Sequence, residues 1–292
     1  MDKKTFTVHG KADNIKTEKI RRAAAVGLGG CYEKHTGCFG GFLWHQPFGY
    51  TGKNIAAIEQ TIHHALPAFD LYRAFTSEII MNKLRDRDGI HIDNVSKALD
   101  RLQQDGYHRV LIQPTHVING DEYNKLCSLA APFTEAMSVS IGAPLLTSIQ
   151  DYKDTVAAIK QEIPAPEEAE AIVFMGHGTE HHANAAYALL EYMLHDFGWK
   201  HAFVGTVEGY PALEQVMQQL KNYPEVKRVR LHPLMVVAGD HAKNDMAGEE
   251  KDSWRAQLQA AGYDVSCILH GLGEYESVRQ LFAQHATAAQ YI

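Results

Sequence analysis

Three side chains have the types and settings expected of metal ligands. His177 stands between two glycines directly after the apolar run 171–175, and His241 and Glu122 each follow a Gly-Asp pair, in AGDHA and NGDEY. Flanking glycines let the backbone turn sharply and leave an imidazole uncovered. Two imidazoles and one carboxylate suit Co²⁺, Fe²⁺, Ni²⁺ or Zn²⁺ rather than Mg²⁺ or Ca²⁺. We therefore predict His177, Glu122 and His241 as metal ligands and catalytic residues.

An internal repeat relates two of these residues. A shift of 119 residues places Pro114 on Pro233 and Gly120-Asp121 on Gly239-Asp240, so that Glu122 falls on His241. A shift of 130 residues matches an earlier segment: Asn54 with Asn184, Thr76 with Thr206, and Glu78 with Glu208. We interpret the matches as an old duplication. Chance similarity of two α/β units is the alternative.

The elements that would position these residues alternate between helix and strand. Hydrophobic periodicity predicts helices at 54–66 and 94–104 and strands at 69–75 and 109–118. Such alternation predicts an α/β fold with parallel sheets flanked by helices. We expect two similar Rossmann-like lobes, 1–147 and 148–292, with a cleft between them. Ligands of such sheets bind beyond the carboxyl ends of the strands.

Composition excludes several classes of function. The 292 residues carry a formal net charge of −7 and 45% hydrophobic residues, so no basic field favours nucleic acid. No run of about 18 apolar residues predicts a membrane span, and the polar N-terminus does not resemble a secretory signal. Four cysteines without a CxxC pair favour a reducing compartment, so we expect a cytoplasmic protein. Motifs for nucleotide binding, GxSxG and HEXXH are absent.

One local basic cluster could meet an anionic substrate. Arg73, Lys83 and Arg85, with Arg87, are concentrated around the segment KLRDRD. Charges of alternating sign are more typical of a solvated helix face, and that interpretation stays open. An anionic ligand would make Arg73, Lys83 and Arg85 candidate substrate contacts.

Four segments between roughly residues 54 and 280 carry a resemblance to a known family: VFMGHGTEHHANAAY, HVINGDEYNKL, VGTVEGYP and PLMVVAGDHAKNDMAG. They resemble the anaerobic cobalt chelatases of cobalamin synthesis, class II chelatases related to ferrochelatase. The resemblance implies insertion of Co²⁺ into sirohydrochlorin or its precursor, with His177, His241 and Glu122 around the metal. It implies no nucleotide and no prosthetic group, since Co²⁺ is a substrate. It also suggests that His177 accepts pyrrole protons, with activity falling below about pH 6 as imidazoles become protonated.

Residues 1–52 depart from the family pattern. The family begins with an apolar strand and a Ser-Phe-Gly-Thr-Ser loop, whereas this chain has CFGGFLWHQPFGYTGK. A one-base shift of permitted codons for residues 40–47 would encode Val-Val-Ser-Phe-Gly-Thr-Ser. We interpret the segment as a frameshift product or gene-model error. As written, the sequence predicts a first lobe without its first strand.

Other functions remain open on the sequence alone. Ligand type does not choose cobalt over nickel or iron on the same ring. A non-catalytic metal- or haem-binding carrier on the chelatase scaffold would keep its tetrapyrrole, and a metallohydrolase would need an open coordination position and a base for water. The expected partners are a sirohydrochlorin-type tetrapyrrole and a divalent metal, and a homo-oligomer is compatible with the sequence.

Overall fold

Two β-sheets lie side by side in the computed structural model, which describes residues 22–28 and 54–292. The first sheet has the order β10-β5-β4-β1-β2-β3 and the second the order β7-β6-β8-β9. All neighbouring strands pair in parallel except β10 and β5. The strands are β1 (Arg22–Leu28), β2 (Asp70–Phe75), β3 (Asp93–Asn94), β4 (Arg109–Pro114), β5 (Ser138–Ile141), β6 (Glu170–Gly176), β7 (Ala202–Thr206), β8 (Arg228–Pro233), β9 (Asp264–Cys267) and β10 (Gln290–Tyr291).

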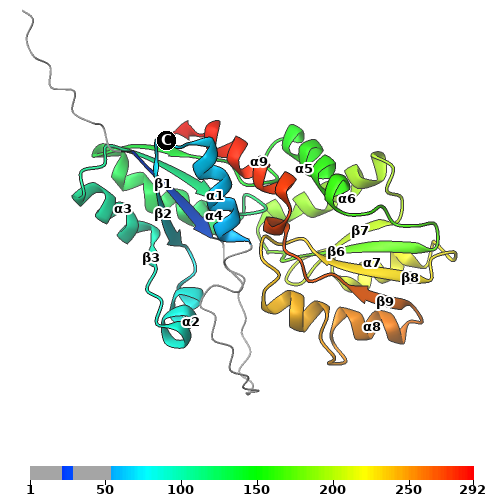
Figure 1. Ribbon diagram of the computed structural model, residues 1–292. Coiled ribbons are helices and arrows are strands. Elements are labelled where there is room, and N and C mark those ends of the chain that lie inside the picture. Colours follow the sequence, from blue (N-terminus) through cyan, green and yellow to red (C-terminus); the bar gives the residue numbers. More distant parts are fainter. Residues whose placement is uncertain (1–21, 29–53) are drawn as a thin grey trace, which may run out of the picture.

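Helices cover both sheets, as the α/β prediction requires (Figure 1). Several begin at a side-chain cap: Asn94 accepts from the Lys97 amide at the start of α3, and Ser148 forms a capping box with Asp151 in α5. The helices are α1 (Ile55–Ala65), α2 (Glu78–Asp88), α3 (Val95–Gln104), α4 (Asp121–Ala130), α5 (Ile149–Glu162), α6 (Ala185–Asp196), α7 (Leu213–Leu220), α8 (Trp254–Ala260) and α9 (Glu276–Thr287). Shorter turns are η1 (Ala131–Glu135), η2 (His182–Asn184), the π-helical η3 (Ala242–Met246) and η4 (Leu272–Glu274).

A strand occupies the place where the sequence predicted a gap. β1 pairs with β2 on one side and β4 on the other, with Gly27 opposite both Ala74 and Pro114. The prediction of a first lobe without its first strand is therefore wrong, because RAAAVGL supplies the backbone donors and acceptors that its two neighbours need. The frameshift interpretation concerned residues 40–47, which lie outside the described residues.

The internal repeat is visible in the strand order. The strand order β5-β4-β1-β2 in the first sheet corresponds to the order β9-β8-β6-β7 in the second. In this comparison β4 is the counterpart of β8, and β2 is the counterpart of β7. The matched pairs Pro114/Pro233 and Thr76/Thr206 lie at or next to the ends of these strands. The predicted helices and strands at 54–66, 69–75, 94–104 and 109–118 are confirmed to within a few residues, apart from the last strand, which ends at Pro114.

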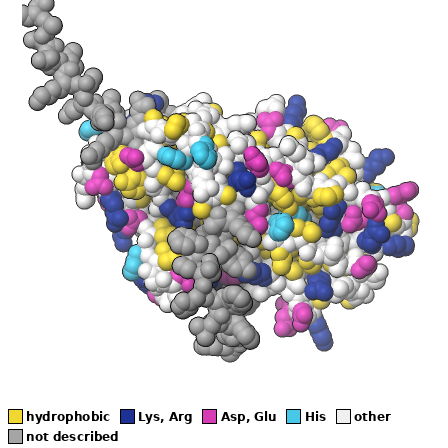
Figure 2. All heavy atoms as spheres, in the orientation of Figure 1, with side chains coloured by type: hydrophobic (Ala, Val, Ile, Leu, Met, Phe, Trp, Pro, Cys, Tyr) yellow, Lys and Arg dark blue, Asp and Glu magenta, His cyan; other side chains and the backbone are white. Residues whose placement is uncertain are grey.

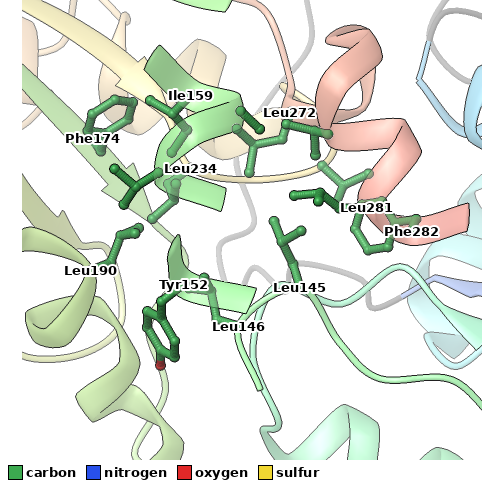
Figure 3. Close-up of a cluster of buried hydrophobic side chains, with 14 of the residues drawn as sticks. Leu145, Leu146, Tyr152, Ile159, Phe174, Leu190, Leu234, Leu272, Leu281 and Phe282 are labelled. Carbon is green, nitrogen blue, oxygen red and sulfur yellow. The ribbon is translucent and has the colours of Figure 1, made fainter. Parts of the chain in front are cut away.

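One hydrophobic core joins the two halves (Figure 3). Leu145 and Leu146, from the segment between the sheets, lie in the same cluster as Phe174 of β6, Leu190 of α6 and Phe282 of α9. Because these side chains are buried in one cluster, the halves are packed together and are not joined by a linker alone.

The C-terminus returns to the first half. α9 packs against α1 and α5, and β10 pairs antiparallel with β5, with Gln290 opposite Ile141. The predicted boundary at 147/148 separates β1–β5 from β6–β9, but β10 belongs to the first sheet. The division into two lobes thus stays a prediction. Among residues 22–28 and 54–292, no helix has the length and apolar character needed to cross a bilayer.

The shared core predicts a large effect of one α9 side chain. Phe282 is fully buried, so Phe282→Ala should lower the free energy of unfolding by about 3–5 kcal/mol through lost burial and a cavity. Ile149, which is 58% exposed, is the control, and Ile149→Ala should change it by no more than about 0.5 kcal/mol. Urea titrations followed by circular dichroism measure both. Equal effects of the two substitutions would contradict a core that includes α9.

A buried histidine makes the stability depend on pH. Burial lowers the pKa of His116 to about 4 from its ordinary 6.5, and neither ring nitrogen has a hydrogen-bond partner within the described part of the chain. The unfolded chain therefore binds a proton that the folded chain excludes, so stability falls as pH drops from about 6.5 to 4. His116→Leu should flatten this loss in urea titrations at pH 7 and 4.5. Burial also lowers the pKa of His232 to about 4, so part of the slope should remain. An unchanged slope would refute the role of His116.

Candidate metal centre

His177 lies where β6 ends, held by close packing of its loop. Gly178 has φ +85°, and a Cβ atom there would lie 2.6 Å from the Gly209 nitrogen and 2.8 Å from Thr206 Cβ. A side chain at this position would therefore be both strained and obstructed. The carbonyl of His177 accepts from the amides of Val207 and Glu208, at 3.1 and 2.8 Å. These bonds attach the loop after β7 to the loop after β6 and bring Glu208 beside the imidazole.

The hydrogen bonds of His177 decide which nitrogen is free. Nδ1 lies 2.8 Å from the Gly178 carbonyl oxygen, which can only accept. In the neutral ring the proton is therefore on Nδ1, and the lone pair is on Nε2. Among the described residues this buried Nε2 has no hydrogen-bond partner. A buried polar atom without a partner is destabilising unless a ligand satisfies it.

His241 has the same arrangement, supplied by different neighbours. Its Nδ1 lies 2.5 Å from Asp245 Oδ2, so the proton faces the carboxylate and the lone pair is again on Nε2. This Nε2 is also buried and, within the described ranges, unpartnered. The chain enters the π-helical turn η3 (Ala242–Met246) directly after His241. Wide turns of this kind are frequent at functional sites.

The two histidines and one acid form a compact ligand set. The rings of His177 and His241 have centroids 5.1 Å apart and are nearly perpendicular, at 85°. One ligand atom each from His177, Glu208 and His241 lie within 4.8 Å of one another. Two imidazole nitrogens and one carboxylate oxygen match the donor preference of Co²⁺, Ni²⁺, Fe²⁺ or Zn²⁺. The structure thus brings His177 and His241 together, and their role as metal ligands stays a prediction.

The acid of this cluster is not the predicted one. Glu208, rather than Glu122, completes the set of three among the described residues. The sequence contained a signal for Glu208, because the repeat matches it with Glu78, and Glu208 lies two residues beyond the end of β7. Acidic residues after strands are common, so this match alone does not single out Glu208 as a ligand.

Glu122 lies nearby in the fold, in the first turn of α4. Thr179 Oγ1 lies 3.3 Å from Asp121 Oδ2, and Asn124 Nδ2 lies 3.2 Å from His181 Nε2. These contacts hold the turn that carries Glu122 against the loop that carries His177. One Glu122 carboxylate oxygen is buried and unpartnered in the part of the chain that the structure describes. Its role as a metal ligand stays a prediction.

The three predicted substrate contacts have different surroundings. Arg73 forms a bidentate pair with Glu59, at 2.7 and 2.6 Å, which occupies its guanidinium. Arg85 pairs with its neighbour Asp86 on the surface of α2. Lys83 instead reaches the second half of the molecule and pairs with Asp240. Whether any of the three contacts substrate stays a prediction.

The Asp245 contact leads to a test of metal affinity. Asp245→Asn keeps the size of the side chain but removes the charge that orients His241 and strengthens it as a ligand. Loss of such a partner typically weakens metal binding about 10–100-fold, so the Kd for Co²⁺ should rise by that factor. Titration calorimetry with Co²⁺ measures it. Asp252→Asn is a matched control on an exposed loop, and a similar rise in that variant would contradict a specific role for Asp245.

Comparison with known proteins identifies the family of the chain. Residues 47–290 match the profile of the family described as cobalt chelatase (CbiK). A sirohydrochlorin cobaltochelatase of Salmonella typhimurium is 45% identical over 237 residues, which cover 80% of this chain and 88% of the relative. The sirohydrochlorin cobaltochelatase CbiKC of Nitratidesulfovibrio vulgaris is 34% identical, covering 79% of this chain and 82% of the relative.

Solved structures show the same fold at low sequence identity. SirB from Bacillus subtilis with Fe³⁺ superposes with a TM-score of 0.58 at 12% identity, covering 91% of this chain and 94% of that one. CbiX, described as the terminal enzyme of siroheme biosynthesis in denitrifying bacteria, gives 0.53 at 16% identity, with 92% and 99% covered. The predicted chelatase-like fold is thus confirmed. With its sequence relatives and this arrangement of strands, the chain belongs to the cobalt chelatase family.

Proposed function

We propose that the protein inserts Co²⁺ into sirohydrochlorin, or its precursor, in anaerobic cobalamin biosynthesis. The observation that carries the proposal is the pair of buried Nε2 lone pairs of His177 and His241 beside Glu208. The names of relatives at 45% and 34% identity support the reaction and the substrate. We place the reaction in the cytoplasm, which the few cysteines favour; of these, Cys127 and Cys267 are free.

Metal insertion requires exchange of ligands and removal of protons. One Co²⁺ enters the ring and two pyrrole N–H protons leave, so that charge is conserved. His241 and Glu208 hold the incoming metal, while Asp245 keeps the lone pair of His241 directed toward it. As ring nitrogens replace His177 on the metal, its free Nε2 accepts one pyrrole proton. Glu208 Oε2, 3.8 Å from His177 Nδ1, then stabilises the imidazolium. The second proton passes to solvent.

Glu122 has a separate place in the proposal. Its unpartnered carboxylate oxygen lies on the α4 turn that faces the His177 loop. We assign it to metal ligation on the route into the site, with Glu208 as the ligand of the histidine cluster. The two acids can be distinguished, because only Glu208 has a carboxylate oxygen within 4.8 Å of both imidazoles.

Cobalt insertion by matched variants tests the proposal. His177→Ala removes both a ligand and the proton acceptor, so its kcat should fall at least about 100-fold, in the range of lost general-base catalysis. Glu208→Gln should weaken Co²⁺ binding more than Glu122→Gln does. Appearance of the metallated product is followed by its absorption spectrum, with Co²⁺, Ni²⁺ and Fe²⁺ assayed in parallel.

The control is His63→Ala, a histidine on the exposed side of α1. It should insert cobalt at the wild-type rate. A wild-type protein that binds one tetrapyrrole and never releases a metallated product would replace the enzyme by a carrier. Full activity in His177→Ala would refute the mechanism.

A further inference from the structure

An exposed ion pair connects α2 to the residue that precedes His241. Lys83 Nζ lies 3.1 Å from Asp240 Oδ2, and both side chains are 58% exposed. These residues are 157 positions apart and belong to different halves of the chain. Exposed pairs contribute only about 0–1 kcal/mol to stability. The contact is therefore weak enough for another carboxylate to replace it.

Lys83 differs from the other cations of α2 in its partner. Arg85 pairs with Asp86, and Arg87 forms a bidentate pair with Asp88, so each arginine is neutralised by the next residue of its own helix. Among the described residues, Lys83 forms no ion pair within α2, and its carboxylate partner, Asp240, lies in the other half of the chain. Asp240 also adds to the raised pKa of Arg87, whose main cause is the hydrogen bond to Asp88. Asp240 thus faces a positive region of α2.

Space is available beside this contact. A surface hollow of about 620 Å³ is lined by Asn82, Lys83, Asp86 and Arg87 of α2. Figure 2 shows Lys and Arg side chains interspersed with acidic ones over the face in view, so basic charge is not concentrated there in one large patch. Recognition of an anion on this face therefore depends on single cations beside accessible space. Lys83 is such a cation, because it is half-exposed and lines the hollow.

Within the described ranges, the Lys83–Asp240 ion pair has no charged equivalent at the corresponding position of the repeat, Asp121. Asp121 corresponds to Asp240, and it also interacts across the halves, but its partner is the uncharged hydroxyl of Thr179 at 3.3 Å. Among the described residues, Asp121 forms no ion pair, whereas Asp240, next to His241, faces Lys83. An anionic ligand would therefore be held at one side of the metal site, which would define its orientation.

We propose that Lys83 binds a carboxylate of the tetrapyrrole substrate and that Asp240 occupies this position until the substrate displaces it. The inference rests on the proposed function, in which the ligand is a polycarboxylate ring. A carboxylate in the place of Asp240 lies at the border of the metal site, because Asp240 directly precedes His241. Displacement frees Asp240 and anchors the ring at one edge. The remaining carboxylates contact residues that the proposal leaves unassigned.

Opposite effects of the two partners test the proposal. Lys83→Met removes the anchor, so the Kd for metal-free sirohydrochlorin should rise about 5–20-fold, as for the loss of one charge-assisted hydrogen bond in partly exposed surroundings. Asp240→Asn removes the competitor, so the Kd should fall about 2–5-fold. A purely structural ion pair would give shifts of the same sign. Binding is measured by fluorescence or absorbance titration without metal.

Two controls define the outcome. Arg228→Met breaks a similarly exposed pair with Glu167, 2.6 Å long, at the amino end of β8 and should leave the Kd unchanged. The effect of Lys83→Met should also shrink at about 1 M salt, where the screening length is about 3 Å. A Kd for Lys83→Met within twofold of wild type, or shifts of the same sign in both variants, would overturn the inference. Because the assay needs no turnover, a protein that binds sirohydrochlorin through Lys83 but never metallates it would refute only the proposed function.

Discussion

The site depends on two imidazoles whose Nδ1–H groups are engaged in hydrogen bonds. His177 donates to the Gly178 carbonyl and His241 donates to Asp245, so both neutral rings have their lone pairs on buried Nε2 atoms. Burying these atoms without partners is unfavourable, and the surrounding structure must compensate for it. A divalent metal held there, as we propose, would satisfy both at once. Under this proposal, protein stability and metal binding are coupled through the same two nitrogen atoms.

The common core provides the rigidity that this geometry requires. Side chains from the segment between the sheets, from β6 and α6, and from α9 are buried in one cluster, as Figure 3 shows. α9 returns from the second half to pack against α1, so the halves are connected by the C-terminal helix as well as by the mid-chain segment that carries Leu145 and Leu146. Close packing of this kind has few intermediate arrangements. The loops after β6 and β7 therefore hold His177 and Glu208 in a defined relation.

Corresponding positions of the two halves carry different residues beside the metal cluster. The strand orders of the halves correspond, but the residue that follows the Gly-Asp pair is Glu122 in one copy and His241 in the other. The two halves thus offer donors of different hardness at this position, and within the described ranges the imidazole that lies against His177 is that of His241, in the second half. The same asymmetry extends to the aspartates, since Asp240 faces Lys83 and Asp121 faces Thr179.

The sequence by itself determined the α/β class, the repeat, and His177 and His241 as partners, because periodicity, internal matches and glycine neighbours are local features. It misled on β1, because RAAAVGL lacks the family's loop signature yet still fills the gap between β2 and β4. Only the tertiary structure placed Glu208 in the cluster, paired Arg73 with Glu59, and brought Lys83 to Asp240. Such contacts join residues distant along the chain, and their distances are set by how strands and helices pack, which no local pattern encodes.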